Sequence, residues 1–477
     1  MKTKNQSKVL HRKLPQRGAA LIILMLAIVL SLVTLVTFRS ERKGPELEAQ
    51  RKTTLALAQA KEALIGFAVG VKLGSSARRP GDLPCPDFDN DGDAETSCGD
   101  MLGSLQERRI GRLPWKTLGL PDLRDGYGER LWYAVSNNFK NNTRTSILNS
   151  DTLGTITVRD SKGNLYLDAT GATGAIAVIF SPGPPLTRQD GHVQNRVCVP
   201  CDALEKCTAT PATNTPHCDP INYLDIAPIG EDNKNFEDGS ADNGFVLGPI
   251  VNASQATVLN DRLITISSAD LMPVLEKRVA GEVLFCLAEY AGDSRNQGRY
   301  PWAAPLNVSA APSYLDVSGA RFGRIPDTQF TRTVTESGAN PMSGNWGANC
   351  NIFSGSGWWL NWKEMVFYAL ADAHKPVDLS TPPGAPEPAC GVTGTCLTVN
   401  APSAVANKQV VVFVAGRRLS DVSGGQPRAS SDTNLNNIYK AKAANYLENQ
   451  NATTSDGVFE RSPISPTFND VLVFSPK

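Results

Sequence analysis

Histidine is scarce in this chain of 477 residues, with four in all, and His11 lies in the basic N-terminal segment. The sequence also lacks the Gly-x-Ser-x-Gly motif of serine hydrolases, a phosphate-binding glycine loop and the His-Glu-x-x-His motif of zinc peptidases. His374 stands directly before Lys375 and Pro376, which is more typical of a helix end than of a catalytic base. We therefore expect no enzymatic activity and no organic cofactor.

The chain also lacks an excess of charge of either sign, since 47 Lys and Arg residues balance 47 Asp and Glu residues. Six of the bases precede Gly18, with no acid among them: Lys2, Lys4, Lys8, Arg12, Lys13 and Arg17. Without them the remainder holds 41 bases against 47 acids, a mild negative charge. Because proteins bind nucleic acids largely by neutralising phosphates with Lys and Arg, we expect no nucleic-acid partner.

A long apolar run follows the basic segment. Residues 19–38 read AALIILMLAIVLSLVTLVTF and contain no charged side chain. At about 1.5 Å per residue, a helix of this length spans the roughly 30 Å of a bilayer's hydrocarbon core. The bases before the run predict a cytoplasmic leader and an exported remainder. The run is too long for an ordinary secretory signal, and the residues after it offer no small-x-small cleavage site. Two alternatives remain, an uncut membrane anchor and processing on the cytoplasmic side.

The junction between leader and apolar run favours processing. The segment KLPQRG ends at Gly18 and is followed directly by AALI from Ala19. A basic leader that ends in glycine before an apolar helix resembles the class III signal of type IV pilins and type II secretion pseudopilins. The resemblance implies that a prepilin peptidase cuts after Gly18 and methylates Ala19. It also implies other pilins or pseudopilins as partners of the N-terminal helix, and a periplasmic body anchored in the bacterial inner membrane.

One position departs from that family. Most members carry a glutamate at the fifth mature position, where its charge is thought to meet the N-terminal amine of a neighbouring subunit; here that position is Ile23. An unpaired charge in an apolar core is costly, so a subunit without the glutamate need not join below an existing neighbour. The largest minor pseudopilin of type II secretion, which caps the tip, lacks the glutamate too. The resemblance therefore implies a tip or priming subunit of a pilus or pseudopilus, exposed at the cell surface after assembly and able to act in adhesion.

Ile23 is equally expected of a plain membrane anchor. The alternative function is thus a single-pass, membrane-anchored periplasmic binding protein that never enters a filament.

The body of the chain contains an internal repeat, in which six short matches recur in the same order. The clearest are RIGRLP from Arg109 with RFGRIP from Arg321, NYL from Asn222 with NYL from Asn445, and Asn260-Asp261 with Asn469-Asp470. We expect a leader at 1–18, a transmembrane helix at 19–45, a first pilin-like repeat at 46–274 and a second at 275–477. In each repeat a helical pattern precedes Pro-rich loops and short strands, which predicts an α+β fold of helix plus antiparallel sheet. The expected strands include residues 155–158, 175–180, 263–266 and 410–414.

Ten cysteines in an exported body indicate disulfides. The spacing favours Cys85 with Cys98, Cys390 with Cys396, two bonds within the group Cys198, Cys201, Cys207 and Cys218, and Cys286 with Cys350 as the remaining pair. A second interpretation treats the 198–218 group, with His192 and His217, as zinc ligands. We favour disulfides, because oxidation competes for the same thiols outside the cytoplasm.

One acidic loop has the spacing of a cation site. Its carboxylates alternate on either side of Gly92: Asp87, Asp89, Asp91, Asp93 and Glu95. This pattern resembles the start of an EF-hand loop, whose oxygen ligands wrap calcium, although the twelfth position is Cys98 where a bidentate glutamate belongs. We expect either calcium in a loop closed by a Cys85–Cys98 bridge, or a solvated acidic turn.

Four tryptophans gather in the second repeat: Trp346, Trp358, Trp359 and Trp362. They belong either to the core or to an exposed binding patch, and we favour the core.

Overall fold

The computed structural model describes residues 44–71, 78–98, 109–140, 147–171, 173–196, 220–234, 244–306, 314–317, 319–327, 345–353, 357–377, 389–390, 395–420, 425–428, 441–453 and 456–475. Gly18, Ala19, Ile23 and all but the last two residues of the expected transmembrane helix lie outside these ranges. Within the described ranges, no helix is both long enough and apolar enough to span a membrane.

The described part is α+β, as the sequence predicts, and is built around two four-stranded antiparallel sheets. The strand order of the first sheet is β1 (Ile110–Arg112), β2 (Trp132–Val135), β5 (Ala177–Ser181) and β9 (Arg262–Ile266). That of the second is β10 (Phe322–Arg324), β11 (Val366–Leu370), β14 (Val410–Val414) and β16 (Val471–Phe474). In both sheets the two central strands are buried along their whole length, which agrees with their continuous apolar sequences.

Each half also carries a three-stranded sheet of mixed direction. The first has the order β4 (Leu165–Leu167), β3 (Val158–Arg159) and β6 (Phe245–Val246). The second has the order β13 (Ser403–Lys408), β12 (Leu397–Ala401) and β15 (Val458–Glu460). In both, the central strand pairs antiparallel with one neighbour and parallel with the other. The first half has a further hairpin of β7 (Ile250–Val251) and β8 (Thr257–Leu259).

Short helical turns connect these elements. They are η2 (Asn137–Phe139), η3 (Pro220–Asn222), η4 (Asp372–His374), η5 (Ala443–Asn445), η6 (Asn449–Ala452) and α4 (Gly357–Trp362).

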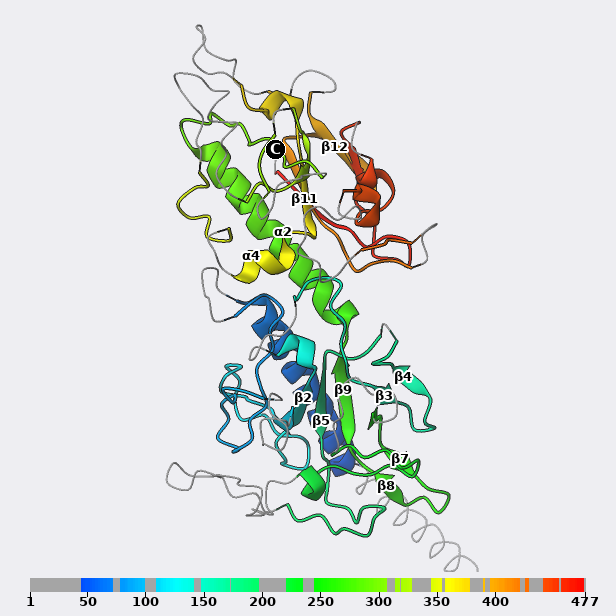
Figure 1. Cartoon of the computed structure of the whole chain (residues 1–477). Helices are drawn as coiled ribbons and strands as arrows, with labels where there is room; N and C mark the ends of the chain where they lie inside the picture. The colour runs from blue at the N-terminus through cyan, green and yellow to red at the C-terminus, as the bar shows by residue number, and fades with distance from the viewer. Residues whose placement is uncertain are drawn as a thin grey trace, which may run out of the picture.

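A helix opens each half. The first covers residues 44–69 and buries Leu57, Ala60, Leu64 and Ala68 on one face, at the spacing of an amphipathic helix. The second, α2 (Ser268–Gly292), runs diagonally from the first half up along the second and packs on β14 and β16 (Figure 1). The repeat boundary expected at 274/275 falls inside α2. The helix begins earlier because the Ser267 backbone N donates to the Asp270 carboxylate at 2.8 Å, a capping interaction that ends the preceding strand.

The largest hydrophobic core is shared by the two halves. It joins the buried face of helix 44–69 to α2 and to both faces of the second sheet. Trp358, Trp359 and Trp362 belong to this core and Trp346 packs against it, which confirms the core interpretation of the aromatic cluster.

The two halves contain equivalent tertiary contacts, in addition to the same arrangement of strands. Gly111 in β1 and Gly323 in β10 occupy the same place in their motifs, and a Cβ at either would lie within 3 Å of a backbone carbonyl, that of Asp87 or that of Ala304. In both halves those carbonyls belong to a segment that pairs with the arginine after the glycine. The glycine of the repeated Arg-x-Gly-Arg motif is therefore required by close backbone approach.

Candidate functional site

The acidic loop is held at both ends. A disulfide joins Cys85 to Cys98, and the Asp87 backbone exchanges two hydrogen bonds with Arg112 of β1, at 2.9 and 2.8 Å. The loop therefore has a fixed position at the edge of the first sheet.

Asp87 shapes the turn inside the loop. One of its carboxylate oxygens accepts the Asn90 backbone N–H at 2.6 Å, and the other accepts that of Gly92 at 2.8 Å. Gly92 has a φ of 94° and lies directly under Trp115, whose ring atoms would be 2.6 Å from a Cβ at that position. The glycine that the sequence pattern requires is thus needed both for its backbone conformation and for the space under the indole.

Three of the five predicted carboxylates converge. Asp87, Asp89 and Glu95 each offer an oxygen that lies within 4.8 Å of the others. Burial raises the pKa of Asp87 to about 7, and the neighbouring negative charge of Asp89 adds to the shift. Burial also raises the pKa of Glu95, again with repulsion from Asp89. Three hard oxygen donors whose negative charges destabilise one another are suited to a divalent cation such as calcium.

The other two carboxylates lie outside this group. Asp91 is exposed and accepts the Asp93 backbone N–H at 2.7 Å. Asp93 is also exposed, and its carboxylate lies 3.9 Å from the Lys116 ammonium. The alternate spacing in the sequence did not distinguish these two residues from the converging three, because the turn at Asn90 and Gly92 separates them.

The cysteines of the described residues form three disulfides: Cys85–Cys98, Cys286–Cys350 and Cys390–Cys396. These are pairings that the spacing favoured. Cys198, Cys201, Cys207, Cys218 and His217 lie outside the described residues. His192, the other histidine of the zinc alternative, makes a 2.9 Å contact with the Asn222 side chain.

His374 lies beside the Cys390–Cys396 bridge. Its Nε2 is 3.7 Å from the Cys390 Sγ, and its Nδ1 contacts the Gly298 carbonyl at 2.8 Å. Burial lowers the pKa of the imidazole. Both sulfurs are in a disulfide and are therefore not thiolate ligands. We interpret this group as structural packing and not as a metal site.

Each half contains a cluster of one arginine and two buried carboxylates, and the repeated sequence motifs include only part of each cluster. In the first half Arg196 donates to the Tyr223 carbonyl and to Gln194, at 3.0 and 2.9 Å, and Gln194 donates to Asp225 at 2.8 Å. The Asp225 backbone N–H then reaches the Asp261 carboxylate at 2.8 Å. Burial raises the pKa of Asp261 well above its ordinary value, and repulsion from Asp225 adds to it.

The second half repeats this arrangement. Arg428 donates to the Tyr446 carbonyl and to Gln426, at 2.9 and 2.6 Å, and Gln426 donates to Glu448 at 2.7 Å. The Glu448 backbone N–H reaches the Asp470 carboxylate at 3.0 Å. The signal that would have found this cluster is Gln-x-Arg before each Asn-Tyr-Leu motif, at 194–196 and 426–428.

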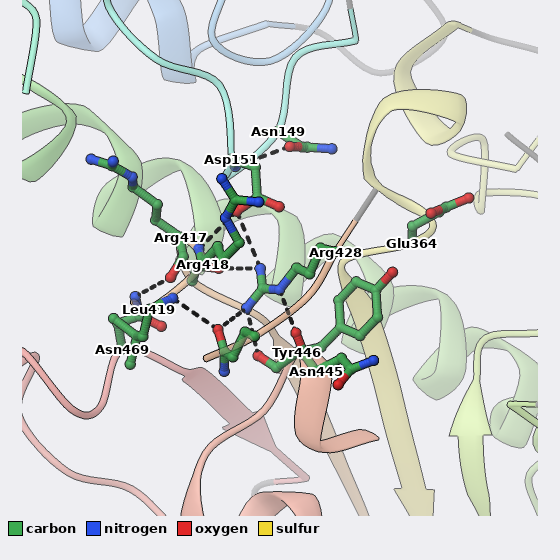
Figure 2. A network of polar contacts seen from close by, with 12 residues as sticks. Asn149, Asp151, Glu364, Arg417, Arg418, Leu419, Arg428, Asn445, Tyr446 and Asn469 are labelled. Carbon is green, nitrogen blue, oxygen red and sulfur yellow. Dashed lines mark hydrogen bonds and ion pairs between the residues drawn. The ribbon is translucent and has the colours of Figure 1, made fainter. Parts of the chain in front are cut away.

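Arg428 also joins the two halves (Figure 2). Its guanidinium lies 3.3 Å from the Asp151 carboxylate of the first half, in a pair that is almost fully buried. The same carboxylate oxygen accepts the Arg418 backbone N–H at 2.7 Å. Close by, the Asn361 side chain of α4 accepts the Leu148 backbone N–H at 2.8 Å, so the 148–151 segment is held by the second half at two points.

Comparison with protein-family models, with characterised proteins and with solved structures finds no match for the chain. Its function must therefore be argued from its own residues.

Proposed function

We propose that this chain is a minor pilin or pseudopilin that primes or caps a type IV pilus or a type II secretion pseudopilus. The observation that carries the proposal is the order of features along the chain. A basic leader ends at Gly18, an uncharged apolar run covers 19–38, and helix 44–69 lays an apolar face on the core of an antiparallel sheet. The pilin resemblance implies this order, with the body in the periplasm and the helix in the inner membrane before assembly.

The proposed place in the filament rests on Ile23. Without a carboxylate there, the subunit cannot pair with the N-terminal amine of an existing neighbour above it, so it starts or ends a filament. Exposure of such a subunit at the tip also places its second half where it can contact a surface or a cargo.

We further propose that the chain is a tandem of two pilin-like units. Support comes from the matched strand orders, the matched Arg-x-Gly-Arg motifs and the matched arginine clusters. We propose that the division between the units falls before Ser268, where α2 begins.

Calcium is the cation that we propose for the acidic loop, with Asp87, Asp89 and Glu95 as its side-chain ligands. The disulfide and the β1 pairing hold these residues in place.

The N-terminus of the mature protein tests the filament proposal. Co-produced with a prepilin peptidase, the chain should be recovered with methylated Ala19 as its first residue, as read by intact-mass and N-terminal peptide spectrometry. Gly18→Val should block the cut, whereas the matched leader variant Gln16→Ala should be processed normally. An uncut wild-type leader would reject the proposal and favour the membrane-anchored binding protein.

The tip assignment needs its own measurement. Immunogold labelling of sheared filaments should find the wild-type chain at filament ends only, whereas Ile23→Glu should allow it along the shaft. Labelling of the shaft by the wild-type chain would contradict a cap or primer.

A further inference from the structure

The edge strand of the second sheet borders a cavity. A hollow of about 450 Å³ is lined by Pro273 and Lys277 of α2, by residues 461–464 and by residues 470–474. Strand β16 occupies the outer position in its sheet, and among the described strands it pairs with β14 alone.

The lining indicates that the cavity follows the edge of β16 and not one of its faces. Asp470, Val471, Leu472, Val473 and Phe474 are consecutive, and all five line it. A face of a strand presents every second residue, so an uninterrupted series means that the hollow runs along the edge of the strand.

The hydrogen-bond register shows which backbone groups point into the hollow. Ser475 donates its N–H to the Val410 carbonyl at 3.1 Å, which makes this a hydrogen-bonded pair of the β14–β16 ladder. Because such pairs alternate, Val473 and Val471 also bond toward β14, and the N–H and C=O groups of Leu472 and Phe474 point away from it. No residue in the described part of the chain bonds to those outward groups.

The rim of the hollow carries positive charge. Lys277 of α2 and Arg461 both line it and are exposed, and neither side chain forms an ion pair with a described residue. The carboxylate nearest to Arg461 in sequence, Glu460, accepts the Ser462 hydroxyl. The acid among the lining residues, Asp470, is buried and accepts hydrogen bonds from the Asn451 side chain and the Glu448 backbone N–H.

The floor of the hollow is apolar. Pro273, Pro463, Ile464 and Leu472 contribute to it, and Ile464 is 56% exposed. An extended peptide on β16 would place alternate side chains against this floor.

We propose that β16 binds, by strand addition, an extended segment of a partner protein that carries an acidic residue at one or both ends. Backbone pairing to Leu472 and Phe474 supplies the register, the apolar floor takes alternate side chains, and Lys277 and Arg461 attract the carboxylates. Four residues of β16 extend over roughly 13 Å, at about 3.3 Å per residue, so the segment needs four to six residues. This inference does not depend on processing at Gly18.

Peptide binding to the full-length chain in detergent tests the proposal by fluorescence anisotropy. The probes are labelled peptides DVTVTVD and KVTVTVK, together with DVTVTVD methylated on the backbone nitrogens of its three central residues. The acidic peptide should bind saturably, the basic one at least tenfold more weakly, and the methylated one at least fivefold more weakly because it lacks donors.

Two sets of variants locate the binding. Lys277→Glu with Arg461→Glu should reverse the preference between the acidic and basic peptides. Phe474→Pro removes an outward N–H without breaking the β14 ladder, so it should bind the acidic peptide at least fivefold more weakly than the matched Phe474→Ala, which keeps the N–H. Circular dichroism establishes whether each variant is folded. If Phe474→Pro is not folded, the methylated peptide alone tests backbone hydrogen bonding to β16.

Three results would reject the proposal. Absence of saturable binding, or affinities unchanged within twofold by charge reversal and by backbone methylation, would reject the site. A concentration-dependent dimer in sedimentation that is absent in Phe474→Pro would assign β16 to a second copy of this chain and reject the partner peptide.

Discussion

Single carboxylates decide whether the acidic loop is a cation site. The three converging oxygens of Asp87, Asp89 and Glu95 repel one another, and a bound cation would remove that repulsion. Asp91 belongs to the same sequence pattern but accepts a backbone N–H and faces solvent, so it serves as a matched control.

Terbium luminescence measures this difference, since Trp115 adjoins Gly92 and can sensitise a lanthanide in a calcium site. Asp89→Asn should weaken terbium binding at least tenfold, whereas Asp91→Asn should change it less than threefold. Calcium should displace the terbium. Equal effects of the two variants would place the ion elsewhere, and no sensitised emission from the wild type would support the solvated turn.

Glu276 on α2 links stability to pH. It is 2% exposed, and burial raises its pKa to about 8, with the positive charge of Arg428 offsetting only part of the shift. A glutamate of the unfolded chain titrates near about 4.3. The stability contributed by the protonated side chain is therefore complete below about pH 4, and it is lost as the pH rises through 8.

Glu276→Gln should remove this dependence. The free energy of unfolding of the variant, relative to that of the wild type, should rise between pH 5 and pH 8. The rise should be about 1.4 kcal/mol per pH unit between the unfolded and folded pKa values of Glu276. Urea denaturation at pH 5, 6.5 and 8 measures it. Glu282→Gln, which alters an i,i+4 ion pair with Arg278 on the same helix, is the control. An effect of Glu276→Gln that is the same at all three pH values would contradict a protonated buried glutamate.

Among the elements, the strands were easier to predict from sequence than their packing. The apolar runs at 175–180 and 410–414 gave β5 and β14 because central strands are buried on both faces. The repeat boundary expected at 274/275 lies within α2, because the Ser267 and Asp270 cap starts the helix directly after β9. The arginine clusters were missed because, outside each Gln-x-Arg motif, their contacts join residues 18 to 36 positions apart.

The Cys286–Cys350 bridge ties α2 to a distant segment. It closes a loop of 64 residues, whereas Cys390–Cys396 closes one of 6. In the chain-entropy model, the longer loop contributes about 4 kcal/mol and the shorter about 2 kcal/mol. Cys286→Ala with Cys350→Ala should thus lower the urea midpoint more than Cys390→Ala with Cys396→Ala. The reverse order would show that α2 is held mainly by its packing on β14 and β16.

The two halves of the molecule are expected to unfold as one cooperative unit. Their largest core is continuous, and Asp151 of the first half pairs with Arg428 of the second in a buried contact. A rigid tandem of this kind would suit the proposed filament tip, because a force on the second half would pass to the first half, which follows the proposed membrane helix.

Asp151→Ala tests this coupling. It leaves the Arg428 guanidinium with one carboxylate fewer at a buried junction, and loss of one partner of a buried pair costs about 3 to 5 kcal/mol. Calorimetry should show one transition for the wild type and two separated transitions for the variant. Asp372→Ala, which removes exposed ion pairs with Lys375 and Arg321, should leave a single transition. If the Asp151 variant melts at lower temperature but still in one step, the shared hydrophobic core alone couples the halves. Two transitions in the wild type would show that the halves fold independently despite that core.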